Sequence, residues 1–350
     1  MSNLKHERPG VYSAYDASAV VTAGRGSKTV GVAAKAVRGT VGEVVTLTGY
    51  GAGIAAFGED TTPGMSTILR LLFANGTATV KAVRVAEGGT VSDYEAAFAA
   101  LGNQEAQLLV CDSADPAVHQ ALRTAVETAS ARRRERVGGS GDTPSQLVER
   151  AAKLNSERVV LVGPDALDPK GETLPGVFAA AAVAGVLSEG GDPAVPLNGA
   201  ELTGLGGLTE EYGDNEVDLL VRGGVTPLEQ AAGVLSPVRG ITTRTTTGGA
   251  ADATWRELTT ILIVDDLIPS VRAALRSRFA RAKNTARSRS AIRSLVIVEL
   301  EKKVAAEIID RYGEVRVTAS EEDPAVCLVE FSFSVAHGLN QIYLTVHITV

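Results

Sequence analysis

Two glycine-rich stretches have the residue types that hold phosphate groups in nucleotide-binding proteins. The first, Gly51-Ala52-Gly53-Ile54-Ala55-Ala56, follows an expected strand and matches the loose dinucleotide pattern GxGxxA. That pattern needs a helix N-terminus for the pyrophosphate and an acidic residue about 20 positions further on for the ribose. No acid occurs between Asp60 and Glu87, and Gly58 and Pro63-Gly64 would cut the helix short. The stretch is therefore predicted to be a glycine-rich turn.

The second stretch, Gly24-Arg25-Gly26-Ser27-Lys28-Thr29, has the lysine and the hydroxyl residue of a phosphate-binding loop. In such loops a glycine precedes the lysine, and an apolar strand leads into the loop. Here Ser27 precedes Lys28, and no apolar strand of clear length comes before Gly24. This stretch is predicted to be a linker.

Side chains that could bind a metal or transfer protons are scattered. The four histidines show no ligand spacing and stand at His6, His119, His337 and His347. No GxSxG nucleophile motif occurs. The adjacent Asp265-Asp266 would point in two directions in a helix or a strand, so a helix N-cap is a better interpretation than an acid/base couple. The sequence predicts no catalytic site, no bound cofactor and no metal.

One charged stretch remains, from Val271 to Arg293. It has no acidic residue, in a chain of formal net charge −7, and its eight basic residues are Arg272, Arg276, Arg278, Arg281, Lys283, Arg287, Arg289 and Arg293. One interpretation is a solvated helix face and loop. The other is a basic surface that faces an acidic partner.

Composition narrows the class of protein. A chain of 350 residues is long enough for two or three domains. Its acidic balance, with a pI of about 5.3, argues against general nucleic-acid affinity. Cys111 and Cys327 give neither a metal signature nor a disulfide framework, so we expect a reducing compartment. Met1 to Gly10 lacks the apolar core of a signal peptide, and the apolar run Val177 to Leu187 is too short to span a bilayer.

Periodicity predicts an α+β or α/β chain of several domains. Residues 23–90 are expected to form a small β-rich domain, with strands at Thr29–Val37, Val41–Thr48 and Thr77–Val85 and a helix at Ser66–Phe73. Residues 91–235 are expected to form an α/β layer domain. Its strands are Leu108–Cys111 and Val159–Val162, and its helices begin at the capping box Ser92–Glu95, at Asp115-Pro116 and at the capping box Thr143–Gln146.

Residues 236–340 are expected to form a C-terminal domain. Strands are predicted at Gly240–Thr247, Thr259–Val264 and Val315–Ala319, and helices at Leu267–Phe279 and Ser294–Asp310. From Cys327 to Val335 the odd positions are apolar, and after the break His337–Asn340 the even positions are apolar as far as Val350. Such alternation on both sides of a glycine-containing turn predicts a β-hairpin with one apolar face.

Both ends of the sequence are predicted to be extended arms. Residues 1–22 have too little apolar content to fold alone, and we expect them to lie on another surface. The strand 341–350 keeps its alternation to the last residue, whereas soluble proteins normally protect long apolar edges. It could lie in the sheet of its own subunit or add to the sheet of a neighbour.

Several stretches share their order along the chain with one protein family, and together they cover nearly its full length. They are Val30–Tyr50 followed by Phe57-Gly58, Phe73–Gly76 leading into Val83-Arg84-Val85, Val221–Val225, Gly240–Thr245, and the terminal EDPAVCLVEFSFSVAHGLNQIYLTVHITV. In this order they resemble the tail sheath proteins of contractile machines, which include phages, phage-like bacteriocins and related injection systems. One stretch departs from the pattern, since Arg222-Gly223 stands where the family often has an asparagine.

The resemblance implies a sheath subunit that polymerises helically around a tail tube and contracts to drive the tube through a target envelope. It implies partners that are other copies of the chain, the tail tube, the baseplate and the tail terminator, with no direct nucleic-acid contact and no membrane insertion. Assembly would take place in the host cytoplasm, and the product would be the tail of a virion or of a bacteriocin-like particle. The alternatives are a tail tube or other structural virion protein, and an α/β nucleotide-binding enzyme.

The resemblance also implies that neighbours exchange their terminal strands. The exchanged side chains would be Val11, Tyr12, Tyr15 and Val20 at one end and Ile342, Leu344, Val346, Ile348 and Val350 at the other. The basic stretch 271–293 would then face the tube or a neighbouring sheath subunit.

Overall fold

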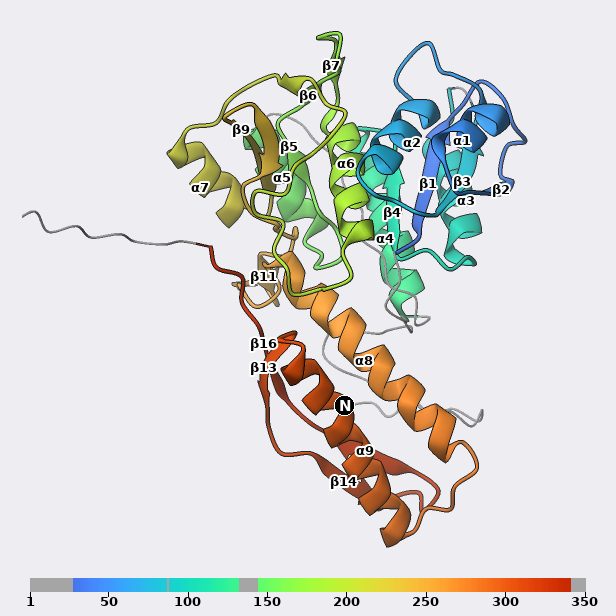
Figure 1. Cartoon of the computed structure of the whole chain (residues 1–350), viewed down its shortest axis with the longest axis vertical. Helices are drawn as coiled ribbons and strands as arrows, with labels where there is room; N and C mark the ends of the chain where they lie inside the picture. Colours follow the sequence, from blue (N-terminus) through green and yellow to red (C-terminus); the bar gives the residue numbers. More distant parts are fainter. Residues whose placement is uncertain (1–27, 87, 132–143, 341–350) are drawn as a thin grey trace, which may run out of the picture.

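The computed structural model describes residues 28–86, 88–131 and 144–340. The two predicted arms, with their exchanged side chains, lie outside the described residues, as does the linker stretch Gly24–Ser27. Helices and small sheets form a body, and a C-terminal unit built on two long helices extends from it (Figure 1). The chain thus has a multi-domain α+β fold, as the sequence predicts.

The first sheet of the body has the strand order β2-β3-β1-β4. Its strands are β1 (Val30–Lys35), β2 (Val44–Leu47), β3 (Val80–Val85) and β4 (Leu108–Cys111). β1 pairs in parallel with β3 and β4, whereas β2 runs antiparallel to β3. All four strands fall within predicted ones. Because β1 lies between β3 and β4, residues 28–85 share one sheet with the first strand of the expected α/β domain.

Gly51 to Ala56 lie inside a helix, so the predicted glycine-rich turn is wrong. Helix α1 (Tyr50–Phe57) packs on α2 (Met65–Ala74), and Gly53 is buried between them. A Cβ atom on Gly53 would lie 2.6 Å from Cδ1 of Leu69, whereas one on Gly51 would meet nothing within 4 Å. The glycine at position 53 therefore permits a close helix approach.

We expect Gly53→Val to destabilise the fold by about 1–3 kcal/mol, because the added methyl groups overpack the contact with Leu69. Gly51→Val is the matched control, since the same side chain at Gly51 would be solvent-exposed. Chemical denaturation would measure both free energies of unfolding. Equal effects of the two substitutions would contradict the packing role of Gly53.

Three helices share a buried hydrophobic cluster with strands of the first sheet. The capping box of α3 (Val91–Gly102) lies two residues earlier than predicted, because the backbone N–H of Thr90 donates to Asp93 at 2.7 Å. α4 (Pro116–Ala131) begins at its proline as predicted, and α5 (Pro144–Leu154) covers the expected helix. Local capping chemistry located the starts of α3 and α4 to within two residues, whereas Thr143, the first residue of the third predicted cap, lies outside the described residues.

His119 of α4 is buried with both ring nitrogens engaged in the neutral form. Nε2 lies 2.8 Å from the carbonyl oxygen of Ser113 and donates to it, while Nδ1 accepts from Nη1 of Arg150 at 3.4 Å. Burial lowers the pKa of His119 to about 4, although the Ser113 hydrogen bond opposes the shift; the Arg150 guanidinium lowers it further. His119 is therefore a neutral core residue.

Because the pKa of His119 is lower in the folded than in the unfolded state, its stabilising effect is complete above about pH 6.5 and is lost as the pH falls towards 4. We expect the loss to reach about 3 kcal/mol. Urea denaturation between pH 4 and 7 would measure the free energy of unfolding of the wild type and of His119→Gln. The variant should lack the loss of stability that protonation of His119 causes. An identical pH slope in both proteins would rule the mechanism out.

Helix α6 (Gly176–Glu189) is the central helix of the body. All its residues except Val186 and Glu189 are buried, as expected for a helix that is apolar on every side. It contacts α2, β4 of the first sheet and β5 (Val162–Gly163) of the second. Local sequence patterns did not predict this helix, whose apolar run is too short to span a membrane. In the described ranges, no helix combines the length and apolar character needed to cross a bilayer.

Short strands complete the body. β5 and β10 (Val234–Pro237) flank β9 (Thr226–Ala231), and β6 (Ala166–Leu167) lies between β7 (Thr173–Leu174) and β8 (Gly207–Leu208). β11 (Thr246–Thr247) pairs with β12 (Ala250–Ala251), and α7 (Asp214–Arg222) packs beside α5. The predicted strand Gly240–Thr247 is therefore wrong over most of its length, since only its last two residues form a strand.

The C-terminal unit begins with α8 (Leu258–Phe279), which runs continuously through two predicted elements. The predicted strand Thr259–Val264 is wrong, and Asp265-Asp266 is in the middle of the helix instead of at its N-cap. α9 (Ala286–Ala305) begins eight residues before the predicted start and runs back along α8 (Figure 1). The chain then forms a two-stranded β-ribbon that packs on α9.

Candidate functional site

The residues that suggested chemistry are not brought together. Gly51 to Gly53 lie in α1, and the Lys28 side chain donates to the carbonyl oxygens of Leu187 and Gly190 at 3.0 Å each, at the C-terminus of α6. His337 is exposed, and His6 and His347 lie outside the described residues. Within the described ranges, no group of three or more His, Cys, Asp or Glu side chains could hold a metal ion.

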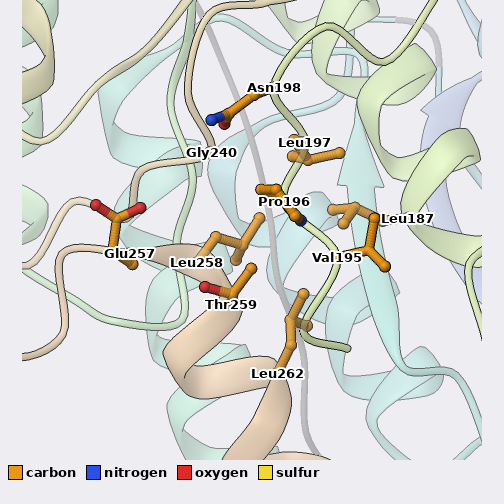
Figure 2. Close-up of a pocket in the computed structure, with 10 residues that line it drawn as sticks. All are labelled: Leu187, Val195, Pro196, Leu197, Asn198, Gly240, Glu257, Leu258, Thr259 and Leu262. Carbon is orange, nitrogen blue, oxygen red and sulfur yellow. The ribbon is translucent and has the colours of Figure 1, made fainter. Parts of the chain in front are cut away.

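A small gap lies where the body meets α8. Figure 2 shows its lining residues, which come from the end of α6, the loop Val195–Asn198, Gly240 and the start of α8. Its volume of about 10 Å³ is close to what one water molecule needs. It is a packing gap, and it is too small for a cofactor or an organic substrate.

The β-ribbon of the C-terminal unit is the first surface suited to assembly. β13 (Ile309–Tyr312) pairs with β16 (Phe333–Val335), and β14 (Arg316–Ala319) pairs with β15 (Cys327–Glu330), in both cases antiparallel. The two pairs form one long ribbon, joined where the N–H of Gly313 donates to the carbonyl oxygen of Ser332 at 2.8 Å. In the part of the chain that the structure describes, no third strand pairs with either edge.

The ribbon has one apolar face packed on the helices. Val317, Val329, Phe331, Phe333 and Val335 pack against a buried cluster formed with α8 and α9. The opposite face and the turn leave apolar side chains in solvent, with Leu328 39% and Val326 41% exposed. Open edges on a ribbon that is backed by helices can each accept a further strand.

The structure adds a partner that was not predicted for the segment Cys327–Val335. The segment pairs with Ile309–Ala319, which precedes it, whereas the predicted hairpin with 341–350 lies outside the described residues. The missed partner had a weak signal in the alternation of Val315, Val317 and Ala319. Residues 341–350 are outside the described part of the chain, so their predicted position stays a prediction.

The turn between α8 and α9 is the second surface suited to assembly. We call the exposed cations of this turn the basic tip. They are Arg276, Arg278, Arg281, Lys283 and Arg287. Among the described residues, none offers these five side chains a hydrogen-bond acceptor or a carboxylate within ion-pair distance. The structure therefore groups cations that have no acidic partner within the described subunit.

The remaining basic residues of this stretch serve the fold. Arg289 donates to Oδ1 of Asn284 at 2.9 Å, and Arg293 donates to the carbonyl oxygen of Val315 at 2.8 Å. Arg272 is half-buried in α8. Sequence reasoning could not separate these three from the basic tip, because all eight share one charge run.

An acidic loop that was not predicted as part of a site lies next to the basic tip. Asn284 donates to the carbonyl oxygens of Pro324 and Val326 at 2.8 and 3.1 Å, and this holds the exposed Glu321-Glu322-Asp323 against the tip. The C-terminal unit thus presents both signs of charge side by side. The run of three acids in the sequence was the available signal.

Comparison with known proteins identifies the family. The model of the phage tail sheath protein central domain matches residues 87–243, and that of the phage tail sheath C-terminal domain matches residues 250–349. The chain belongs to the phage tail sheath protein family. Both surfaces described above lie within the C-terminal sheath domain.

Relatives agree with this assignment. The chain is 28% identical over 271 residues to the tail sheath protein of Bacillus phage SP01, which covers 75% of this chain and 46% of that protein. It therefore spans about half the length of this curated sheath relative. A sheath tail protein from Desulfitobacterium hafniense has the same fold, with a TM-score of 0.75, 12% identity, and coverage of 97% of this chain and 100% of the other.

A second solved structure has the same fold over nearly the whole of both chains. It is the helical sheath of the anti-feeding prophage in its contracted state, with a TM-score of 0.73, 16% identity, and coverage of 98% and 99% of the two chains. At these identities the structures establish the fold of this sheath protein. The resemblance found in the sequence motifs is confirmed.

Proposed function

We propose that this sheath protein is a structural subunit of a contractile tail. It polymerises helically around a tail tube, and contraction of the polymer drives the tube through a target envelope. The observation that supports this most directly is the helix-backed ribbon, neither edge of which pairs with a further described strand, in a chain whose family forms tail sheaths. A head-to-tail contact that does not close into a ring generates a helix.

The open edges are suited to receive terminal strands from neighbouring copies. Residues 1–22 and 341–350 are the proposed donors, through the alternating side chains named above. A ten-residue strand spans roughly 33 Å. Each of its hydrogen bonds would contribute about 0.5–1.5 kcal/mol, and burial of its five apolar side chains up to roughly 7–15 kcal/mol. Such a link is strong enough to hold two subunits together while they rotate.

The proposed partners follow from this role. They are other copies of the chain, an acidic tail tube or neighbouring subunit at the basic tip, and baseplate and tail terminator proteins at the ends of the polymer. We propose no nucleic-acid contact, no membrane insertion and no catalytic turnover. The host cytoplasm is the proposed place of assembly, and the tail of a virion or bacteriocin-like particle is the proposed destination.

Negative-stain electron microscopy of the purified chain, with and without its tail tube protein, tests the proposal. Hollow sleeves wider than a tube, and tube-filled sleeves when the tube protein is present, are the expected results. Narrow tubes formed by the chain alone would instead indicate a tail tube protein. Nucleotide hydrolysis by the purified chain would contradict the absence of turnover.

A further inference from the structure

Helix α8 belongs to two hydrophobic cores. Leu258, Ile261, Leu262 and Val264 in its first two turns are buried in the core of the body. Further along, buried side chains of the same helix help to form the core of the C-terminal unit, namely Ile263, Leu267, Val271 and Leu275. The helix therefore passes from one folded unit to the other between residues 263 and 267.

The weakest turn of α8 lies at this passage. Pro269 is inside the helix, and a proline has no N–H to donate to the carbonyl oxygen four residues earlier, which here belongs to Asp265. The proline ring also disfavours straight helix geometry in this turn. Without other contacts, α8 would bend most easily where the body ends and the C-terminal unit begins.

Two consecutive carboxylates connect this turn to both units. Asp265 faces the body and binds Arg158 through two hydrogen bonds of 2.6 and 2.9 Å, with side chains only 12% and 2% exposed. Asp266 faces the C-terminal unit and forms an ion pair with Lys303 of α9. Adjacent residues on a helix point about 100° apart, so one pair of aspartates can reach both units.

Further charges surround these contacts. Glu157 lies near Asp265 and pairs with Arg244 of the body at 3.2 Å. Lys28 and Asp192 of the body lie near one another, and Lys28 also interacts with Asp266. Asp266 thus interacts with a cation from each unit.

Apolar contact across the passage is limited. Two half-buried side chains, Ile268 and Phe333, pack against both the core of the body and the core of the C-terminal unit. The loop 194–198 of the body adds two further contacts: Ala194 packs against the core of the C-terminal unit, and Asn198 donates to Oδ1 of Asn340 at 2.8 Å. Because these contacts are few, α8 and the charged groups beside it dominate the angle between the units.

We propose that Asp265–Pro269 is a joint between the body and the C-terminal unit, and that the ion pairs Arg158–Asp265 and Asp266–Lys303 fix its angle. The proline makes bending of the joint easy, and the two carboxylates select one orientation. The ribbon and the basic tip then keep a constant direction relative to the body. This inference concerns a single subunit and does not depend on the proposed polymer.

Pulsed electron paramagnetic resonance between two spin labels tests the joint. Labels at Ala96→Cys on α3 and Val298→Cys on α9 report the distance between the units, in a Cys327→Ser background that removes a half-buried thiol. The labelled protein is diluted with unlabelled protein, so that only distances within one chain contribute. We expect the distance distribution to be narrow, and to become at least about twofold wider when Asp265→Asn and Asp266→Asn are combined.

Asparagine keeps the size of aspartate, so Arg158 and Lys303 retain an acceptor but lose the opposing charge. Adding Pro269→Ala to the double variant should restore much of the narrow distribution, because residue 269 regains its N–H donor. Asp218→Asn, which breaks an exposed ion pair with Arg222 on α7, is the matched control and should not widen it. Lys303→Met alone, at the more exposed of the two pairs, gives a milder variant if the double variant does not fold.

An unchanged width in the double variant, or in Lys303→Met if only that variant folds, would overturn the proposal. So would equal widening by Asp218→Asn. A variant that has a wider distance distribution and still assembles into sheaths would support the joint. It would also show that the polymer tolerates a variable angle between the two units. Failure of the wild type to form sleeves would count against the proposed function alone.

Discussion

A chain truncated after Asn340 is expected to remain a folded monomer and to lose helical assembly completely. The described residues already form three packed clusters, and the ribbon that closes the C-terminal unit pairs within residues 309–335. If 341–350 is donated to a neighbour, its removal leaves the subunit's own core unchanged. The open edge of the neighbour then has no strand to bind.

Thermal melting and sedimentation would measure the two effects separately. We expect a melting temperature within about 4 °C of the full-length chain, which corresponds to about 1 kcal/mol or less, together with a monomeric sedimentation coefficient. If 341–350 instead lay in its own subunit's core, five apolar side chains would be lost from it, at a cost on the order of 10 kcal/mol. A truncated chain that aggregates or melts early would place the strand there.

Two substitution variants provide matched controls for the truncation. Changing Ile342, Leu344, Val346, Ile348 and Val350 to serine should abolish assembly, because it removes the apolar face of the strand while keeping its length. Changing Tyr343, Thr345, His347 and Thr349 to serine alters the other face of the same strand and should leave sleeves intact. Loss of assembly in both variants would argue against one-sided docking on the ribbon.

Elements with strong local signals could be predicted from the sequence. β4 was predicted with its observed bounds, α2 to within one residue at each end, and α4 from the proline at its first position. Each has a boundary set by nearby residues, such as Asn75-Gly76 after α2. Local chemistry determines such boundaries without reference to the rest of the fold.

α8 shows why other elements could not be predicted. Thr259–Val264 is rich in β-branched residues, which favour strands, and Asp265-Asp266 followed by Pro269 looks like the start of a new helix. Burial against two cores outweighs these local preferences and keeps one continuous helix. The pairing of the ribbon is likewise set by contacts between distant residues, which periodicity does not report.

The candidate surfaces were partly visible in the sequence. The charge run 271–293 identified the basic tip, but only the fold separates its five exposed cations from Arg289 and Arg293, which bind the chain's own oxygens. The open ribbon edges could not be seen at all, since they depend on which strand pairs with 327–335. Alternation predicts strands and faces, whereas edges are a property of the whole sheet.

Reversing Arg276, Arg278 and Arg281 to glutamate is expected to weaken assembly on tail tubes by about 2- to 30-fold per contact. Each exposed contact contributes about 0.2–1 kcal/mol, and reversal turns an attraction into a repulsion. These three side chains have no acidic partner within the described subunit, so the substitutions should leave its stability nearly unchanged. Co-sedimentation with preformed tubes would measure assembly, and thermal melting would measure stability.

Salt dependence and a matched variant determine whether the location of the charges matters. The deficit should be largest at low ionic strength and shrink as salt screens the contact, because the Debye length falls from roughly 30 Å at 0.01 M to 3 Å at 1 M. Reversing Arg123, Arg222 and Lys302 changes the net charge equally, but each of these basic residues lies outside the ribbon and already pairs with a carboxylate of its own subunit. This control should assemble better than the basic-tip variant at every salt concentration. If both variants and the wild type assemble equally at low salt, the basic tip is only a solvated end of the helix pair. If the assembly deficit of the basic-tip variant does not change with salt, the tip binds through shape instead of charge.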